Sequence, residues 1–156
     1  MIDIRNLDVV FGHGSGVHHA VRDFAMRIEP GQSYGLVGES GSGKTTVLRA
    51  LAGLLDRVAR VSGEMTVAQE SLQGQRRSRD FRRRVQMVFQ DPFGSLHPRH
   101  TVDTILAEPA RVHRLDRIED RVVQALEEVG LDASFRFRYP HQISGGQRQR
   151  VSVARA

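Results

Sequence analysis

The segment that most constrains this chain is the glycine-rich stretch 38–45. It reads Gly38, Glu39, Ser40, Gly41, Ser42, Gly43, Lys44 and Thr45. The glycines let the backbone turn where side chains would clash, so that successive N–H groups can point inward at phosphate oxygens. Lys44 supplies a mobile cation for the β- and γ-phosphates, and the Thr45 hydroxyl can ligate Mg²⁺. The spacing therefore predicts a loop that holds the phosphates of a nucleoside triphosphate.

The flanks of this loop predict a strand before it and a helix after it. Residues 33–37 read as a short buried strand, and residues 45–55 carry apolar side chains at helical spacing. The apolar side chains of the helix are Val47, Leu48, Leu51, Leu54 and Leu55. The N-terminus of such a helix would face the phosphates, where backbone donors and the helix dipole favour anions. A linker that matches the pattern by chance would lack this strand and helix.

Composition bounds the class of protein. The 156 residues are enough for one domain. The net charge of +5 and the pI near 10.8 come mostly from arginine. Such a charge is ordinary for a protein that binds phosphate groups, and we prefer this interpretation to binding of nucleic acid or of an anionic membrane. The absence of cysteine excludes disulfides, thiolate metal sites and a cysteine nucleophile. No apolar stretch approaches the roughly 18 residues of a membrane span, and the N-terminus lacks a signal-peptide core, so we expect a soluble, cytoplasmic chain.

The N-terminal part predicts antiparallel strands. Apolar side chains alternate over residues 2–11 and 24–28, and a glycine-rich turn is expected at 13–19. The seven histidines form no H-x-x-x-H or HExxH pattern, and His18 and His19 fall in the expected turn. We therefore interpret the histidines as solvated or turn residues rather than metal ligands.

The middle of the chain predicts two more strands, at 61–67 and 85–89, the second of them buried. The run 75–84 lies between them, with Arg76, Arg77, Arg79, Arg82, Arg83 and Arg84. In isolation this run resembles a nucleic-acid patch. It has no interleaved aromatic residue beyond Phe81 and leads directly into a strand, which favours a solvated connector. Proline and glycine then predict a loop over 90–96.

From residue 101 onward the periodicity becomes helical. One helix is predicted over 102–109, and its apolar stripe indicates core packing. A second is predicted over 118–129, preceded by the capping pair Asp116 and Glu119 and ended by Gly130.

A third helix is predicted over 147–156, after a break at 136–141. Ser144 stands just ahead of this helix, and Gly145 and Gly146 open the backbone beside it. A hydroxyl and free N–H groups at a helix N-terminus form a second arrangement suited to an anion.

The phosphate loop, the Gln90 loop and the segment 143–150 together resemble the nucleotide-binding subunit of ATP-binding cassette (ABC) transporters. The last segment reads Ile143, Ser144, Gly145, Gly146, Gln147, Arg148, Gln149 and Arg150. Within this family the resemblance is to the importers of dipeptides, oligopeptides and nickel, and it covers the whole chain. The stretches that carry this finer resemblance are 35–40, 88–92, 95–96, 98–99 and 139–141.

This resemblance implies that ATP and Mg²⁺ are the cofactors. Phe11 matches the aromatic residue that stacks on adenine. Residues 38–46, which end at Thr46, match the phosphate loop, with Lys44 on the β- and γ-phosphates and Thr45 on Mg²⁺.

The resemblance also implies partners. Gln90 matches the glutamine that contacts the metal and the attacking water and signals to the membrane subunit. Four residues match the signature sequence, which binds the γ-phosphate of ATP held by an opposite subunit: Ser144, Gly145, Gly146 and Gln147. The implied partners are a second ABC nucleotide-binding subunit, identical or not, and transmembrane permease subunits. The implied location is the cytoplasmic face of the cell membrane.

The implied fold class is α/β. It comprises a P-loop nucleotide hydrolase core, an antiparallel β subdomain at the N-terminus and a helical subdomain. The expected divisions are 1–90 for the β subdomain and core, 91–143 for the Gln90 loop and helical subdomain, and 144–156 for the signature and its helix.

The chain departs from the family pattern in three respects. Ile143 in place of leucine and Thr45 in place of serine are mild, because they keep the apolar character and the hydroxyl. The third departure is that the sequence ends at Ala156. In the family, a strand ending in a metal-linked aspartate, a glutamate that polarises water and a switch histidine come later. Lys44 and Gln90 are thus the only catalytic residues of the pattern present, and an exposed apolar sheet edge is expected.

Three functions remain open from the sequence. The first is an energy-coupling ATPase subunit of an importer, of which this sequence is a fragment. The second is a remnant that binds nucleotide without turnover. The third, an ABC ATPase that acts on nucleic acid or ribosomes, is supported only by the arginine run.

Overall fold

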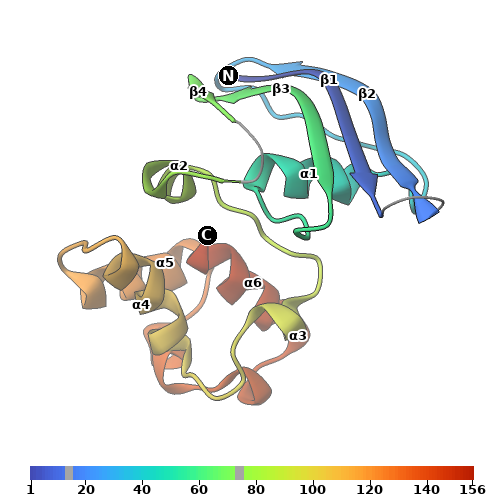
Figure 1. Cartoon of the computed structure of the whole chain (residues 1–156). Helices are drawn as coiled ribbons and strands as arrows, with labels where there is room; N and C mark the ends of the chain where they lie inside the picture. Colours follow the sequence, from blue (N-terminus) through green and yellow to red (C-terminus); the bar gives the residue numbers. More distant parts are fainter. Residues whose placement is uncertain (13–15, 73–75) are drawn as a thin grey trace. The chain divides into compact units, whose positions relative to one another are not determined.

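The computed structural model of the chain describes residues 1–12, 16–72 and 76–156 (Figure 1). The chain divides into two compact units, Met1–Val85 and Gln86–Ala156. Each unit has its own hydrophobic core. Within the described ranges, no helix has both the length and the apolar character needed to cross a membrane.

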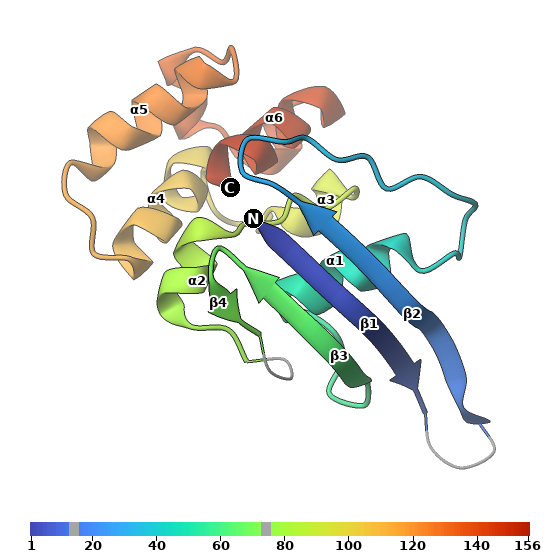
Figure 2. The ribbon, with the colours of Figure 1, turned by 90° about the horizontal axis from the view of Figure 1, so that it is seen from above.

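In its described part, the first unit contains a four-stranded sheet with the spatial order β2-β1-β3-β4. The strands are β1 (Ile2–Phe11), β2 (His18–Ile28), β3 (Arg60–Val67) and β4 (Glu70–Ser71). All pairs are antiparallel, which confirms the antiparallel strands predicted for the N-terminal part, and Figure 2 shows the three long strands side by side.

The start of β2 corrects one expectation. His18 and His19 do not lie in a loop, because the ladder between β1 and β2 extends to the end of β1, where His18 pairs with Phe11. Of the turn predicted at 13–19, residues 13–15 lie outside the described residues.

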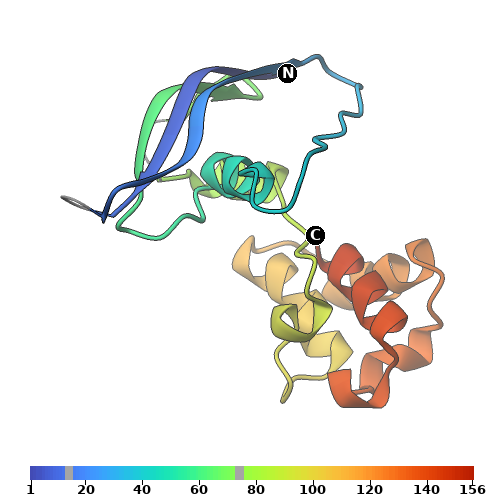
Figure 3. The ribbon, with the colours of Figure 1, turned by 90° about the vertical axis from the view of Figure 1, so that its right-hand side faces the viewer.

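The helix that follows the phosphate loop is α1 (Lys44–Ala52), and it lies against one face of the sheet (Figure 3). It ends earlier than predicted, because Gly53 takes a left-handed conformation with φ +69° and donates its N–H back to the helix. Its buried residues are Val47, Ala50 and Leu51. Leu48 and Leu54, which belong to the predicted apolar stripe, are about half exposed.

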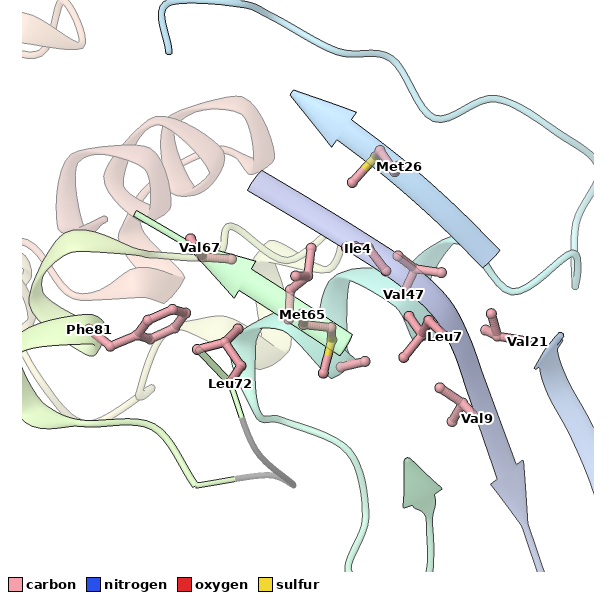
Figure 4. Packing of buried hydrophobic residues seen from close by; sticks show 12 residues of the cluster. Ile4, Leu7, Val9, Val21, Met26, Val47, Met65, Val67, Leu72 and Phe81 are labelled. Carbon is pink, nitrogen blue, oxygen red and sulfur yellow. The ribbon is translucent and has the colours of Figure 1, made fainter. Parts of the chain in front are cut away.

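The core of the first unit lies between the sheet and α1. Figure 4 shows Val47 of α1 beside Ile4 and Leu7 of β1. The buried members of this core are Ile4, Leu7, Val9, Val21, Met26, Val47, Ala50, Leu51, Met65, Val67, Leu72 and Phe81. The packing therefore fixes the helix that carries Lys44 against the antiparallel sheet.

Two predicted strands are absent from the structure. Neither 33–37 nor 85–89 forms a strand, and among the described residues no ladder includes them. Several of their apolar side chains are exposed, up to 89% at Val37 and 41% at Val88, whereas Leu36 and Val85 pack partly against the core. Both predictions were wrong because an apolar pattern indicates burial, whereas a strand also needs a hydrogen-bonding partner. These two segments therefore contribute no strand to the described sheet.

The arginine run is only partly a solvated connector. Its described residues contain helix α2 (Arg79–Arg84). The N-cap of this helix is Ser78, whose hydroxyl accepts a hydrogen bond from the N–H of Phe81 at 2.9 Å. Phe81 is buried in the core, and Arg77 is also buried. The prediction of a solvated connector is therefore wrong for Arg77.

The second unit is helical. Its elements are α3 (Pro92–Ser95), α4 (Val102–Val112), α5 (Ile118–Glu128), the 3₁₀ turns η2 (Ala133–Phe137) and η3 (Pro140–Gln142), and α6 (Gly145–Arg155). The buried core residues are Leu96, Val102, Ile105, Leu106, Ala107, Val122, Leu126, Leu131, Ile143 and Val151. The segment predicted as a loop over 90–96 contains the short helix α3.

The ends of α5 show one wrong and one confirmed prediction. Its N-cap is Arg117, in a left-handed conformation without a side-chain cap, so the predicted capping pair of Asp116 and Glu119 does not form. Arg117 instead pairs with Asp120 at 2.9 Å, one turn into the helix. Gly130, with φ +68°, ends the helix as predicted and donates its N–H to the Glu127 carbonyl at 2.9 Å.

Candidate functional site

The phosphate loop turns at three glycines with positive φ. The angles are +153° at Gly38, +83° at Gly41 and +89° at Gly43. At Gly43 an added Cβ atom would collide with the carbonyl oxygen of Ala20 on β2, so glycine is required by both conformation and space. The backbone of the loop therefore favours glycine at these three positions.

The ammonium group of Lys44 lies among the carbonyl groups of this loop. Its Nζ atom donates to the carbonyl oxygens of Gly38 at 2.7 Å and Glu39 at 2.5 Å, and it lies 3.2 Å from Oγ of Ser42. All three donors of an ammonium group can be used in this way. Phosphate oxygens are stronger acceptors for a cation than neutral carbonyls, so a bound triphosphate would draw Nζ away from these partners.

The N-terminus of α1 adds backbone donors next to Lys44. The first hydrogen bond of the helix runs from the N–H of Val47 to the Gly43 carbonyl at 3.0 Å, so the N–H groups of 44–46 have no partner within the helix. The first turn carries no acidic side chain, Thr45 is exposed and Thr46 is half-buried. This helix end can therefore offer N–H donors to an anion and a hydroxyl oxygen to Mg²⁺, which prefers oxygen ligands.

A hollow of about 350 Å³ lies beside the loop in the first unit. Residues of β2, of the segment 36–38 and of α1 line it, among them His19, Arg22 and Lys44. The sequence alone does not identify His19 and Arg22 as neighbours of the loop, because no local pattern places β2 beside it. The hollow is thus open space directly beside Gly43 and Lys44.

The structure places Phe11 and Gln90 in different surroundings. Phe11 is the last residue of β1, is half-buried and packs against the core of the first unit. Gln90 belongs to the second unit, where it is exposed and lies two residues before the start of α3. Its amide oxygen is chemically suited to Mg²⁺, as is the Thr45 hydroxyl.

Ser144 forms the predicted N-cap of α6. Its Oγ atom accepts from the N–H of Gln147 at 3.3 Å, and the Gln147 side chain accepts from the N–H of Ser144 at 2.9 Å. The helix begins two residues earlier than predicted, at Gly145, and there is open space beside both Gly145 and Gly146. The end of α6 therefore presents a hydroxyl and two glycine N–H groups to solvent, an arrangement suited to phosphate.

Two arginines of α6 lie near this end of the helix. Nε of Arg148 donates to the carbonyls of Pro140 at 2.7 Å and Ile143 at 3.2 Å, which ties the preceding turn to the helix. Arg150 lines a hollow of about 490 Å³ together with Ser144 and Gln147. Nothing in the sequence distinguishes Arg148 from its neighbouring arginines, because the two carbonyls that it contacts come together only in the folded turn.

Comparisons with known proteins identify the family of the chain. The family model described as ABC transporter matches residues 21–156. The chain is 42% identical to the oligopeptide transport ATP-binding protein AmiF of Streptococcus pneumoniae and 42% identical to OppF of Bacillus subtilis. Both matches cover 100% of this chain and 52% of the relative, so the chain spans about half the length of these curated relatives.

Solved structures show that the fold matches that of ABC cassettes. The chain matches MJ0796, a bacterial ABC transporter cassette solved as a dimer, with a TM-score of 0.81 and 25% identity over 99% of this chain and 68% of the other. It matches cbiO1 of Clostridium perfringens with a TM-score of 0.77 and 26% identity over 99% of this chain and 59% of the other. The chain belongs to the ABC transporter family. Its resemblance to the ATP-binding proteins of peptide importers and its cassette fold are both confirmed.

Proposed function

We propose that this chain is the nucleotide-binding part of an ATP-binding subunit whose ATP hydrolysis drives import of peptides or a similar small solute. The observation that carries the proposal is the phosphate loop, in which Lys44 is held between the carbonyls of Gly38 and Glu39 at the head of α1. The peptide-transport names of the relatives support the choice of solute.

In this proposal the first unit binds MgATP. Lys44 exchanges its carbonyl partners for β- and γ-phosphate oxygens, and the N–H groups at the start of α1 add further donors. The Thr45 hydroxyl would ligate Mg²⁺, which would supply positive charge next to the phosphates. Phe11 would stack on adenine, and its place at the end of β1 leaves part of the ring exposed for this contact.

The second unit would act on the nucleotide of a partner subunit. Ser144 and the N–H groups of Gly145 and Gly146 would contact the γ-phosphate held by a second cassette, so that two ATP molecules are enclosed between two subunits. A dimer is described for the related cassette MJ0796. Closure of the pair would move attached permease subunits. This attachment would hold the protein on the cytoplasmic face of the membrane.

The contacts of two arginines weigh against the alternative of an action on nucleic acid. Within the arginine run, Arg77 is buried, and Arg84 forms ion pairs with Asp80 at 3.0 Å and Glu70 at 3.3 Å. Fewer positive charges of the run therefore remain for phosphate contacts than the sequence suggests.

ATP-dependent association tests this function. We expect the chain to form dimers with MgATP and to remain monomeric without it, measured by sedimentation velocity. Ser144→Arg would block the facing phosphate, and Ser144→Asp would keep a capping side chain but repel the phosphate. Both variants should bind ATP and stay monomeric. Dimers of either variant at wild-type ATP concentrations would contradict the proposal.

A further inference from the structure

Arg77 is the one charged side chain that is buried among the described residues, with 5% of its surface exposed. It belongs to the first unit and precedes α2, the helix of the arginine run. Burial lowers the pKa of its guanidinium, and the nearby Glu70 partly opposes this effect. A charge that is taken out of water in this way must be compensated by hydrogen bonds.

The contacts of Arg77 lie at the C-terminal end of α1. Its Nε atom donates to the carbonyl of Leu51 at 2.7 Å, and Nη2 donates to the carbonyl of Ala50. The guanidinium carbon lies 5.6 Å from the centre of the Phe81 ring, which is itself buried. Carbonyls in the last turn of a helix keep acceptor capacity for a side chain, and a cation there is also favoured by the helix dipole.

The same helix carries the phosphate loop at its other end. Helix α1 has nine residues, about 13 Å of rigid rod. At its start, Gly43 packs directly against the Ala20 carbonyl of β2. At its end, the planar guanidinium of Arg77 donates to two carbonyls, a geometry that fixes both the position and the direction of this helix end.

We propose that Arg77 is a positioning residue for the bound triphosphate: it fixes the far end of α1 and thereby holds Lys44 and Thr45 in register with the loop. This inference rests on the proposed function, because it needs a phosphate at the loop. Loss of these hydrogen bonds would allow α1 to slide or tilt, and small displacements of a binding group are costly.

The test compares Arg77→Met and Arg77→Lys with a matched control, Arg83→Met, which removes an exposed arginine from α2. Binding of MgATP and of inorganic triphosphate is measured by calorimetry at a temperature where unfolding curves show each protein to be folded. We expect Arg77→Met to lose affinity for both ligands by the same factor, on the order of tenfold. Arg77→Lys should lose less, because its ammonium can still reach one carbonyl, and Arg83→Met should match the wild type.

The outcomes separate the inference from the function on which it rests. Wild-type affinity in folded Arg77→Met would make Arg77 a purely structural residue and overturn the inference. If Arg77→Met does not fold, Arg77→Lys is used instead, and wild-type affinity of that folded variant would overturn the inference. Failure of the wild type to bind either ligand would overturn the proposed function and the inference with it.

Discussion

The hydroxyl groups of Ser95 and Ser152 lie 2.9 Å apart and share a hydrogen bond. Ser95 ends α3, which follows Gln90, and Ser152 is a buried residue of the signature helix α6. Arg155 adds a second link, because its Nη1 atom donates to the Ser95 carbonyl at 2.7 Å. Within the second unit, the Gln90 loop and the signature helix are thus connected through side chains.

Ser152→Ala should lower the free energy of unfolding by about 1 kcal/mol, because it removes one side of a buried hydrogen bond. Urea unfolding of this variant, of Ser95→Ala and of the double variant measures the coupling between the two side chains. We expect the double variant to lose less than the sum of the single losses. Strict additivity would show that the two hydroxyls do not interact.

Asp132 should make the second unit sensitive to acid. Hydrogen bonds from Ser134 lower the pKa of Asp132 below its ordinary value of 3.8. A lowered folded-state pKa contributes stability that is present above pH 3.8 and is lost as the pH falls through the folded value. The gap in melting temperature between the wild type and Asp132→Asn, which keeps a capping oxygen, should therefore be wider at pH 7 than at pH 2. An equal gap at both pH values would contradict this.

Phe11→Ala separates stacking from packing. If Phe11 stacks on adenine, the variant should bind ATP more weakly, by about 1 kcal/mol, and inorganic triphosphate unchanged. Phe11→Tyr keeps the ring and should retain both affinities. Because Phe11 also packs against the core, equal losses for the two ligands would assign it to the core alone. Titration calorimetry gives both values.

Local patterns predicted much of the fold and of the phosphate site. The alternation over 2–11 is realised as β1, because one face of that strand is covered by the core. The spacing of glycines in the phosphate loop matches positions of positive φ, a requirement that only glycine meets at low cost. Ser144 and Gln147 cap α6 by a contact between near neighbours in the chain, which sequence can reveal.

The failures involve partners that are distant in sequence. Residues 33–37 have a strand pattern but no partner strand among the described residues. Arg77 looks like its exposed neighbours, yet its side chain reaches carbonyls 26 and 27 positions away. The capping pair of Asp116 and Glu119 failed for a local reason, because Arg117, in a left-handed conformation, takes the N-cap position of α5 in place of Asp116.

The central claim is that Lys44 binds the phosphates of ATP, and Lys44→Ala tests it most directly. Lys44 is the single lysine of the chain, and Arg49→Ala, which removes an exposed cation from the same helix, is the matched control. Titration with MgATP should show a loss of about 2 kcal/mol, roughly thirty-fold in Kd, for Lys44→Ala and no change for Arg49→Ala. Equal affinity of folded Lys44→Ala and the wild type would contradict the assignment of the phosphate loop.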